Sequence, residues 1–400
     1  MKILQINSVC GVGSTGRIAT NIHELLLQQG YESLIAYGRG KANRCEAVIR
    51  IGNIFDVLLH IVKSRLFDKH GLGSKKSTRA LVNAITEADP DLIHLHNIHG
   101  YYVNYEILFK YLIAQDKPVV WTLHDCWSFT GHCAYYDLSG CNKWMLECKK
   151  CMLKKSYPKS YFADNSMNNY RLKKKYLMKM KNIMLVTPSE WLKTEVSKSF
   201  LSDRDCIVVH NGINISVFKP SENHLRSKLG LDEKIVYLGV ANPWSKRKGL
   251  RFFYEMSSLL NSDEIILLIG LDRIQLKSLP NNILGFEKTD SVVELARIYS
   301  LSNVFINPTL EDNYPTTNLE AIACGLPIVT FDTGGSAECL EKYSGKSVKE
   351  KSADALLRAA RELVENKITN KKCDKKYVSM DYSVNQYIDI YKRMLLNTNK

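Results

Sequence analysis

Short runs of branched apolar residues recur along the chain, and longer segments with apolar residues at helical spacing separate most of them. The first series lies at residues 2–6, 33–37, 91–95, 118–123 and 183–186, and the second at residues 235–240, 265–269, 304–306 and 327–331. The runs lack a strict alternation of polar and apolar residues, which is typical of strands buried on both faces of a parallel sheet. Two such series predict an α/β chain of two doubly wound, Rossmann-like domains, whose ligands bind at the carboxyl ends of the strands.

A turn and a proline mark the junction between the two series. The joining segment, residues 206–220, contains Asn211-Gly212 and ends at Pro220, which stops regular structure. We therefore predict an N-terminal domain over residues 1–219 and a C-terminal domain over residues 220–382. The last segment has apolar residues at helical spacing, which predicts a helix over residues 383–400 that is able to pack on either domain.

The composition of the chain indicates its cellular location and the charge of its partners. No run of about 18 apolar residues is present, and the apolar opening of the chain is too short and too soon polar for a signal peptide. We therefore expect a soluble, cytoplasmic protein whose 11 cysteines are reduced. The net charge of +14 favours an anionic partner. Because no nucleic-acid-binding module is recognisable, we expect a solvated or membrane-facing basic surface and no nucleic acid.

The strongest chemical signal is the segment 309–330, which follows a predicted strand and runs into a short helix that Gly325 ends. A loop that leads into a helix N-terminus offers unpaired N–H groups and the positive end of a dipole, which suits a diphosphate. The carboxylates of Asp312 and Glu320 suit the hydroxyls of a sugar and a ribose. Thr317 and Glu320 also have the spacing of a capping box, and that structural role alone would account for both residues.

A second segment, residues 239–250, leaves the first strand of the second domain and carries Lys246, Arg247 and Lys248. Cations at the mouth of a strand would stabilise a diphosphate leaving group, which is the electrostatic task of a transferase that uses no metal. An ordinary solvated start of a helix is the alternative interpretation of these three charges.

Two further segments in the first half follow predicted strands. Residues 10–17 form a glycine-rich turn before a helix, a weak signal that lacks the Lys-Ser/Thr ending of a nucleotide-hydrolysing phosphate loop. His124 ends the fourth predicted strand and should lie at the carboxyl edge of the sheet. A metal trio of His94, His96 and His99 is conceivable, but no nearby carboxylate completes a ligand set. Strand-end packing and acceptor contacts are therefore their expected roles.

Cysteines crowd into an insertion at residues 126–158 that has no predicted helix or strand. Cys148 and Cys151 form a Cys-x-x-Cys pair after Cys133 and Cys141. These four thiolates predict a structural zinc site that would staple the insertion, because four sulfur ligands satisfy tetrahedral zinc. Reduced cysteines that simply pack in the insertion are the alternative.

The acid segment resembles the paired-acid signature of the retaining glycosyltransferases of family 4, which have the GT-B fold of two Rossmann-like domains facing across a cleft. In that family seven residues separate the two acids, as they separate Asp312 from Glu320. The resemblance implies that Asp312 holds hydroxyls of the donor sugar and that Glu320 binds the ribose of the nucleotide. Because Glu311 directly precedes Asp312, which of these two acids faces the sugar stays open. The resemblance extends donor binding to the residues between the acids: Asn313, Tyr314, Thr316, Thr317 and Asn318.

The other motifs also have counterparts in this family. Lys248 matches a Lys-Gly position, and Arg247 would replace the arginine of an earlier Gly-Arg pair, which reads Ala241-Asn242 here. His124 matches a cleft histidine that contacts the donor sugar. The resemblance therefore implies that His124, Asp312, Lys248 and Arg247 form the catalytic group. The glycine-rich turn resembles a loop near the acceptor and the diphosphate, where these residues are expected to act: Gly11, Gly13, Gly16 and Arg17.

Along nearly its whole length the chain resembles a subset of these transferases found in exopolysaccharide pathways of the colanic-acid type. The resemblance implies transfer of a hexose-type sugar from a UDP- or GDP-sugar, without a catalytic metal and with retention of configuration. The implied acceptor is a saccharide linked to polyprenyl diphosphate. The basic, amphipathic helix at residues 54–69 would suit the anionic inner face of the cell membrane, and core packing of that helix is the alternative.

Two other classes of protein stay open at this stage. A non-catalytic protein of the same fold would bind a nucleotide sugar or a saccharide and form no product. A zinc-stapled nucleic-acid-binding protein would prefer a short duplex to a nucleoside diphosphate. Product formation and the preferred ligand therefore separate both alternatives from a transferase.

Overall fold

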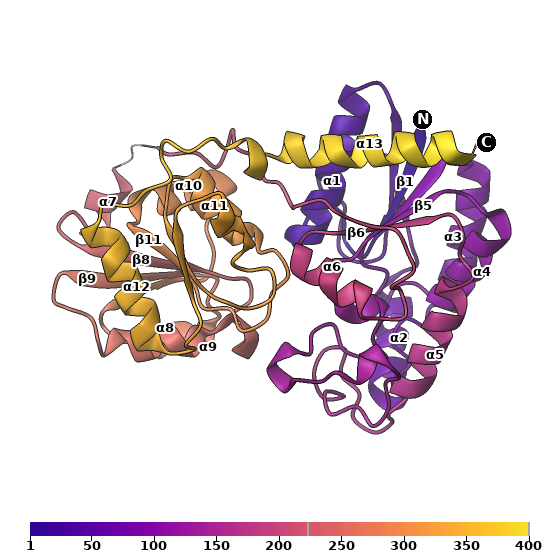
Figure 1. Cartoon of the computed structure of the whole chain (residues 1–400), viewed down its shortest axis with the longest axis horizontal. Helices are drawn as coiled ribbons and strands as arrows, with labels where there is room; N and C mark the ends of the chain where they lie inside the picture. The colour runs from indigo at the N-terminus through magenta and orange to yellow at the C-terminus, as the bar shows by residue number, and fades with distance from the viewer. Residues whose placement is uncertain (222–223, 399–400) are drawn as a thin grey trace. The chain divides into compact units, whose positions relative to one another are not determined.

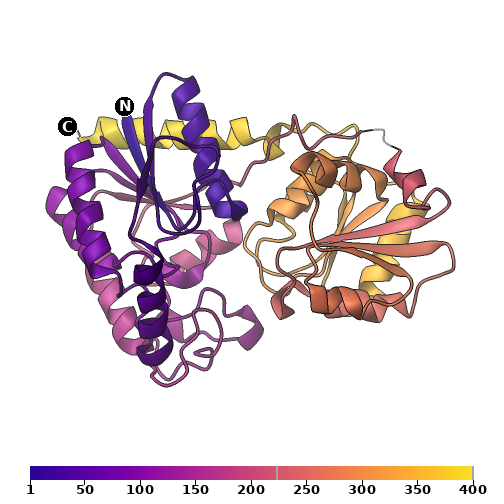
Figure 2. The same cartoon turned by 180° about the vertical axis from the view of Figure 1, so that it is seen from behind.

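The chain folds into two α/β units, each with its own sheet and its own apolar core (Figures 1 and 2). The computed structural model describes all residues except 222–223 and 399–400. Unit 1 comprises Met1–His210 together with the C-terminal segment from Val384 onward, and unit 2 comprises Asn211–Ser383. Among the described residues, no helix is long and apolar enough to span a membrane.

Unit 1 contains a sheet of seven parallel strands in the order β3-β2-β1-β4-β5-β6-β7. Strands β4 and β5, near its centre, are buried along their whole length, as expected where helices cover both faces of a parallel sheet. The strands are β1 (Lys2–Asn7), β2 (Glu32–Tyr37), β3 (Val48–Arg50), β4 (Leu92–Leu95), β5 (Val119–Thr122), β6 (Ile183–Thr187) and β7 (Cys206–Val208).

Helices connect these strands, and side-chain caps fix several of their first turns. Asn53 and Asp56 form a capping box on α2, Asn104 caps α4, and Ser189 caps α6. The helices are α1 (Gly13–Gln28), α2 (Ile54–Phe67), α3 (Lys75–Ala88), α4 (Tyr105–Gln115), α5 (Ser166–Leu177) and α6 (Glu190–Ser197). Three 3₁₀ turns lie in the insertion: η1 (Cys126–Ser128), η2 (Asp137–Ser139) and η3 (Lys143–Met145).

The C-terminal helix α13 (Met380–Thr398) packs on unit 1 from Val384 onward (Figure 1). Its Tyr391 hydroxyl lies 2.6 Å from His94 Nδ1, and its Tyr387 hydroxyl accepts a hydrogen bond from Thr122 at 3.1 Å. Both tyrosines are buried. The last helix is thus tied by hydrogen bonds to β4 and β5 of the first sheet.

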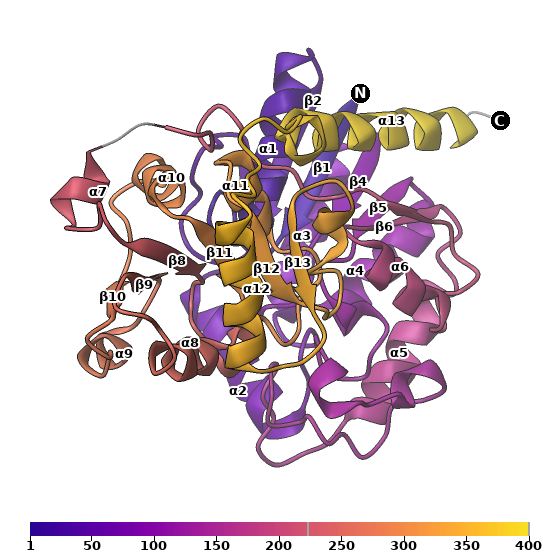
Figure 3. The same cartoon turned by 60° about the vertical axis from the view of Figure 1, so that its left-hand side comes forward.

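Unit 2 contains six parallel strands in the order β10-β9-β8-β11-β12-β13, and α12 covers one face over β11, β12 and β13 (Figure 3). The strands are β8 (Ile235–Val240), β9 (Glu264–Ile269), β10 (Ile283–Phe286), β11 (Val304–Asn307), β12 (Ile328–Phe331) and β13 (Gly345–Val348). The helices are α7 (Leu225–Lys228), α8 (Leu250–Ser257), α9 (Arg273–Lys277), α10 (Val292–Leu301), α11 (Thr316–Ala323) and α12 (Ala353–Glu365). The 3₁₀ turns are η4 (Lys246–Lys248), η5 (Glu338–Glu341) and η6 (Lys376–Val378).

Two parallel, helix-covered sheets confirm the predicted fold class of two Rossmann-like domains. Four strands had not been predicted, and all of them lie at or next to a sheet edge: β3, β7, β10 and β13. These strands are three or four residues long and mostly half-buried. A short strand covered on one side only has no continuous apolar run, so its sequence resembles that of a loop.

Candidate active site

A compact group of charges follows strands β8 and β11 in unit 2. Lys248 Nζ lies 2.5 Å from Asp312 Oδ2, and Arg247 Nη1 lies 3.8 Å from the same oxygen. Arg247 also donates a hydrogen bond to the backbone carbonyl of Glu311. Asp312 is 8% exposed, and its Oδ1 accepts a hydrogen bond from the N–H of Asn313 at 3.0 Å. The structure thus brings together the basic segment and the acid segment that the sequence had singled out.

Asp312 is held in its ionised form by these neighbours. Burial alone would raise the pKa of the carboxyl group, because an ionised carboxylate loses its hydration. Lys248 and Arg247 act in the opposite direction and outweigh burial, so the pKa lies below its ordinary value. Asp312 therefore carries a full negative charge at neutral pH and keeps two cations beside it.

Gly249 allows the basic turn η4 to approach the end of β11. Its φ of 77° lies in the left-handed region, and a Cβ at this position would stand 2.1 Å from the carbonyl oxygen of Pro308. The N–H of Leu310 also donates to the carbonyl of Arg247 at 2.8 Å. Glycine is therefore required after Lys248 for a steric reason. A larger residue at position 249 would push the cations away from the acid segment.

Glu320 lies in the middle of α11, where it is 4% exposed. The hydroxyl of Tyr299, on α10, donates to Glu320 Oε2 at 3.0 Å. The capping-box interpretation of Thr317 and Glu320 is wrong, because α11 begins at Thr316 and its N-cap is Pro315, which makes no side-chain cap. Thr317 and Glu320 are the second and fifth residues of the helix, so neither has the N-cap or N3 position that a capping box requires.

The remaining predicted donor residues divide between buried and half-buried positions. Asn313 and Tyr314 are buried, and Thr316 and Thr317 are half-buried at the start of α11. Asn318 is fully buried, accepts from Asn307 Nδ2 at 2.7 Å and donates to the Ser336 carbonyl at 2.8 Å. Its amide group is thus engaged in fixing α11 to β11.

In unit 1, His124 follows β5 and stacks on His96, with ring centroids 5.4 Å apart and an interplanar angle of 17°. His96 Nε2 lies 3.0 Å from Gln5 Oε1, and His96 Nδ1 lies 3.2 Å from His124 Nε2. Because the amide oxygen of Gln5 accepts only, His96 carries its proton on Nε2, and His124 Nε2–H donates to His96 Nδ1. This network leaves His124 Nδ1 as an acceptor. Burial lowers the pKa of His124 to about 4, so the ring is neutral at physiological pH.

A small, shallow pocket lies at the carboxyl ends of β4 and β5, beside this histidine pair. His96, His99, His124 and Asp125 supply polar groups to its lining, and Trp121 supplies an aromatic wall. Unit 1 thus gathers polar side chains at the strand ends, where parallel sheets bind their ligands.

The three histidines around β4 have separate partners. His94 is fully buried and contacts Tyr391 and Thr122 at 2.6 and 2.8 Å, whereas His99 Nε2 lies 2.8 Å from Asp125 Oδ2. In the described part of the chain, no group of three or more His, Cys, Asp or Glu residues is arranged to hold a metal ion. His94 thus serves packing against α13, and His96 and His99 reach the pocket.

The glycine-rich turn forms a tight entry into α1. Gly11 has a φ of 71°, and a Cβ there would stand 2.0 Å from the carbonyl oxygen of Asn43. Its N–H donates to the carbonyl of Gly16 at 3.2 Å. Arg17 Nε donates to the carbonyl of Gly13 at 3.3 Å, and no side chain caps the N-terminus of α1. The first turn of α1 is thus uncapped by side chains at the glycine-rich segment.

The predicted zinc site has no support in the structure, which contains no metal-binding group among the described residues. Cys133 packs in the core, and Cys148 Sγ accepts a hydrogen bond from the N–H of Gly131 at 3.1 Å. Burial raises the pKa of Cys148 to about 11 and that of Cys151 to about 12, so these thiols keep their protons. Cys141 is half-buried against the same core. The packing alternative therefore replaces the zinc prediction.

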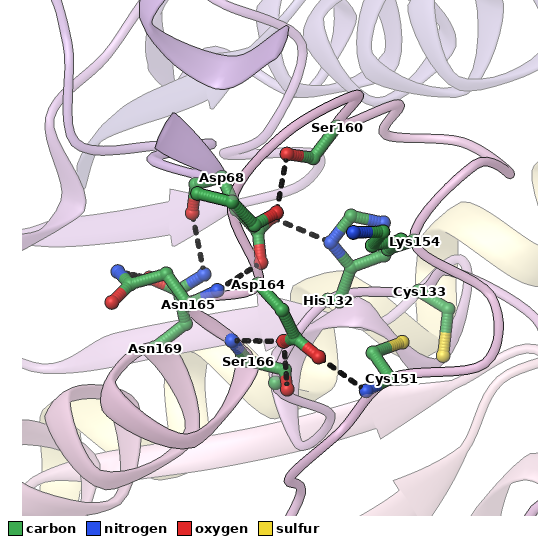
Figure 4. A network of polar contacts seen from close by, with 12 residues as sticks. Asp68, His132, Cys133, Cys151, Lys154, Ser160, Asp164, Asn165, Ser166 and Asn169 are labelled. Carbon is green, nitrogen blue, oxygen red and sulfur yellow. Dashed lines mark hydrogen bonds and ion pairs between the residues drawn. The ribbon is translucent and has the colours of Figure 1, made fainter. Parts of the chain in front are cut away.

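A buried polar network holds the insertion in place of a metal (Figure 4). Asp68 Oδ1 lies 2.6 Å from His132 Nδ1, and its Oδ2 accepts from the N–H of Asn165 at 2.8 Å. Asp164 accepts from the N–H of Cys151 at 2.5 Å and from the hydroxyl of Ser166 at 2.6 Å. Two carboxylates thus fix the ends of a long loop by charge-assisted hydrogen bonds.

The sequence reasoning missed two residues that orient site residues. Tyr299 holds Glu320, but it falls on the apolar face of its helix and therefore reads as an ordinary core residue. Gln5 orients His96 and is fully buried in the middle of β1. A glutamine inside an otherwise apolar strand was an available signal, because buried amides need hydrogen-bond partners.

Comparison with known proteins identifies relatives of both units. A family model described as "Glycosyltransferase Family 4" matches residues 15–217, and one described as "Glycosyl transferases group 1" matches residues 232–366. A protein of Escherichia coli (strain K12) named as a colanic acid biosynthesis glycosyl transferase, WcaC, is 26% identical over 381 residues, which is 90% of each chain. Escherichia coli UDP-Gal:alpha-D-GlcNAc-diphosphoundecaprenol alpha-1,3-galactosyltransferase is 26% identical over 218 residues, 48% of this chain and 54% of that protein.

Solved structures share the fold at low sequence identity. A glycosyltransferase from Rickettsia africae superposes with a TM-score of 0.69 at 16% identity and covers 98% of both chains. Anabaena Alr3699/HepE, crystallised with UDP and glucose, gives a TM-score of 0.69 at 14% identity and covers 98% of this chain and 99% of its own. Two parallel Rossmann-like sheets, these neighbours and a family model that matches half of the sequence lead to one conclusion. The chain belongs to glycosyltransferase family 4 and is a glycosyltransferase with the GT-B fold.

Proposed function

We propose that the chain transfers a hexose-type sugar from a UDP- or GDP-sugar to a saccharide linked to polyprenyl diphosphate, in surface polysaccharide biosynthesis and with retention of configuration. The contact between Lys248 and Asp312 carries the proposal, because it joins a cation and a carboxylate beside the uncapped start of α11. The relatives named for colanic acid biosynthesis and for a diphosphoundecaprenol acceptor support the pathway and the acceptor class.

In the proposed reaction, the bond between the anomeric carbon and the diphosphate oxygen breaks, and the acceptor oxygen forms the new bond as its proton passes to the departing diphosphate. Negative charge develops on the departing diphosphate, where Lys248 and Arg247 would stabilise it. Asp312 would exchange its contact with Lys248 for the hydroxyls of the sugar. Glu320, held by Tyr299, would accept hydrogen bonds from the ribose.

Unit 1 would act on the acceptor. Neutral His124 would contact a sugar hydroxyl, and the first turn of α1, with Gly13 and Arg17, would contact a phosphate group. We propose that the residues 1–219 act as the acceptor-side domain and that residues 220–382 bind the nucleotide sugar.

The outward face of α2 supports peripheral attachment to an anionic bilayer. Polar His60 and Ser64 are buried, whereas the exposed side chains include Ile54 at 60%, Phe55 at 71% and Leu59 at 63%. Phe162, which is 74% exposed, lies on a segment whose backbone bonds to the end of α2 through Tyr161 N–H and Arg65 O at 2.7 Å. Exposed cations rim this surface: Lys63, Arg65, Lys69 and Lys159. Apolar residues ringed by cations suit acidic lipid headgroups.

Vesicle binding tests this surface. Replacing Phe55 and Leu59 together by Ser should weaken binding to vesicles with anionic lipid by about 10²-fold, since each buried side chain contributes about 1.5–3 kcal/mol. Ile274, which is 80% exposed on α9, provides the matched control Ile274→Ser. Equal binding by both variants would show that α2 is not the membrane surface, and a change in oligomeric state instead would assign the face to a second copy.

Turnover tests the proposed function itself. The purified chain is incubated with a panel of UDP- and GDP-sugars and a synthetic polyprenyl-diphosphate-linked monosaccharide in detergent. We expect sugar transfer from one donor, and the anomeric configuration of the product, read by NMR, tests retention. Binding of a nucleotide sugar without any product would favour the non-catalytic alternative.

A further inference from the structure

Arg39 is a partly buried cation at the carboxyl edge of the first sheet, and no carboxylate among the described residues forms an ion pair with it. It follows β2, and its backbone N–H donates to the carbonyl of Ser8, just after β1, at 2.8 Å. Its side chain lies against Gly100, where an added Cβ would be 3.8 Å from both Nε and Cζ of Arg39. Within the described residues, the buried Nε has no hydrogen-bond partner. Folded proteins normally pair a guanidinium that they remove from water, so this arrangement needs an explanation.

Three tyrosines lie within the electrostatic reach of this guanidinium: Tyr101, Tyr102 and Tyr157. Burial raises the pKa of Tyr101, and the positive charges of Arg65 and Arg39 oppose that rise. Tyr157 also senses Arg39, and its hydroxyl lies 3.1 Å from His99 Nδ1. The carboxylate of Asp125, which also acts on Tyr157, is engaged with His99 and with the N–H of Trp127. Aromatic rings therefore lie near Arg39, whereas the carboxylate of Asp125 is bonded to other groups.

A second donor in the same neighbourhood also lacks an acceptor. His70 is 2% exposed, and its Nε2 accepts a hydrogen bond from the N–H of Gly100 at 3.3 Å, so its proton is on Nδ1. Among the residues that the structure describes, His70 Nδ1 has no partner. The His70 ring lies 4.8 Å from the Tyr101 ring and 5.7 Å from the Tyr157 ring, measured between centroids. Arg39 Nε and His70 Nδ1, both near Gly100, are thus donors without an acceptor among the described residues, and an anionic ligand would supply one.

We propose that Arg39 binds a phosphate group of the lipid-linked acceptor, with the rings of Tyr101 and Tyr157 against its first sugar. A guanidinium matches phosphate oxygens with two parallel hydrogen bonds, and it stacks on aromatic rings more readily than an ammonium does. The donor diphosphate is proposed to contact Lys248 and Arg247, with Arg17 near a phosphate, so an acceptor that carries its own diphosphate needs a further cation. This inference rests on the proposed acceptor class and adds the group that recognises it.

Binding of an isoprenyl diphosphate tests the assignment without turnover. Farnesyl diphosphate, farnesol and UDP are titrated into the full-length wild-type chain and into Arg39→Gln and Arg39→Lys, with tryptophan fluorescence or calorimetry as the readout. Arg39→Gln should bind farnesyl diphosphate about tenfold or more weakly, with UDP unchanged, because charge-assisted hydrogen bonds are lost. Arg39→Lys should fall between wild type and Arg39→Gln, because it keeps the charge without the bidentate geometry.

Arg50 provides the matched control, because its guanidinium already donates to the Gly40 carbonyl at 2.7 Å and lies 4.9 Å from the Tyr37 ring centroid. Arg50→Gln removes the same charge and should leave farnesyl diphosphate binding intact. Loss of UDP affinity in Arg39→Gln would instead assign the arginine to the donor, and equal weakening by Arg50→Gln would reduce the effect to net charge. If Arg39 governs isoprenyl diphosphate binding but the chain transfers no sugar, the proposed function fails and the subsite stands. If the chain transfers sugar and Arg39→Gln keeps the acceptor KM, only the subsite fails.

Discussion

Replacing Lys248 by Met removes the ammonium group from Asp312 and keeps most of the apolar side chain. The Lys248 and Asp312 side chains are 22% and 11% exposed, so the ion pair is largely shielded from water. Truncating one partner of a fully buried pair costs about 3–5 kcal/mol. Asp312 keeps Arg247 at 3.8 Å and the Asn313 N–H at 3.0 Å, so we expect the loss in unfolding free energy to be about 1–3 kcal/mol.

Differential scanning calorimetry or urea unfolding measures this loss. For a unit of this size, about 1 kcal/mol shifts the Tm by roughly 2–4 °C. Asp312→Asn should cost less, because a lone Lys248 can extend its charge into water. The pKa of Asp312 is depressed in the folded state, so the pair stabilises the protein above about pH 4 and loses its effect as pH falls through the depressed value. In Lys248→Met the folded-state pKa rises toward the unfolded-state value, so the part of the acid-induced loss that comes from Asp312 should be smaller.

The same variant tests the proposed chemistry. Loss of one electrostatic donor to a leaving group slows turnover by about 10² or more, so kcat of Lys248→Met should fall by at least that factor while UDP still binds. The double variant Lys248→Met with Asp312→Asn should recover stability without recovering kcat. A folded Lys248→Met enzyme with an undiminished kcat would refute the role of Lys248, and equal stability losses in both single variants would refute the buried ion pair.

Two further predictions concern the histidines of unit 1 and the glycine beside the cations. Burial lowers the pKa values of His60 and His124 to about 4. Below about pH 6.5 the unfolded chain therefore binds more protons than the folded chain. The free energy of unfolding should fall by about 1.5–2 kcal/mol per histidine as the pH drops from about 7 to 5. Urea unfolding of His60→Gln at both pH values checks this, and an unchanged pH dependence would contradict it. Gly249→Ala should destabilise unit 2 by about 2 kcal/mol or more, because the added Cβ would lie 2.1 Å from the carbonyl oxygen of Pro308. Gly13→Ala should destabilise the protein by only about 1 kcal/mol, because Gly13 also has a positive φ, 64°, but has open space around it. Similar thermal shifts for both glycine variants would remove the steric argument.

The pattern of apolar residues along the chain was sufficient to predict the buried strands. It was insufficient where contacts between distant residues determine the structure. Central strands such as β4 and β11 are fully buried, so their apolar runs identified them. The sequence of α2 suggested core packing or membrane contact, and only the structure shows that His60 and Ser64 face inward and Phe55 outward. Buried polar side chains need specific partners, here Ser74 and two backbone N–H groups for His60, which a single sequence does not reveal.

The zinc prediction failed for a related reason. The cysteines lie within electrostatic reach of Cys133, but among the described residues they are not arranged in the geometry that a metal ion requires. In the structure Cys148 Sγ is used by the N–H of Gly131, and the carboxylates of Asp68 and Asp164 anchor the insertion. Asp68 lies 97 residues before its backbone partner Asn165. Hydrogen bonds between residues so far apart in the sequence leave no local pattern from which they could be predicted.

The Lys248–Asp312 pair also bears on which acid faces the sugar. Glu311 contributes its backbone carbonyl to Arg247, whereas Asp312 contributes a carboxylate to both cations. A diphosphate that binds these cations must draw them from Asp312, and an ionised carboxylate left beside phosphate oxygens would repel them. Hydrogen bonds from sugar hydroxyls relieve that repulsion, because they stabilise the carboxylate without adding charge. Donor binding would then be an exchange in which the phosphates take the cations and the sugar takes the acid. Such an exchange needs a carboxylate already in contact with the cations, and Asp312 makes that contact.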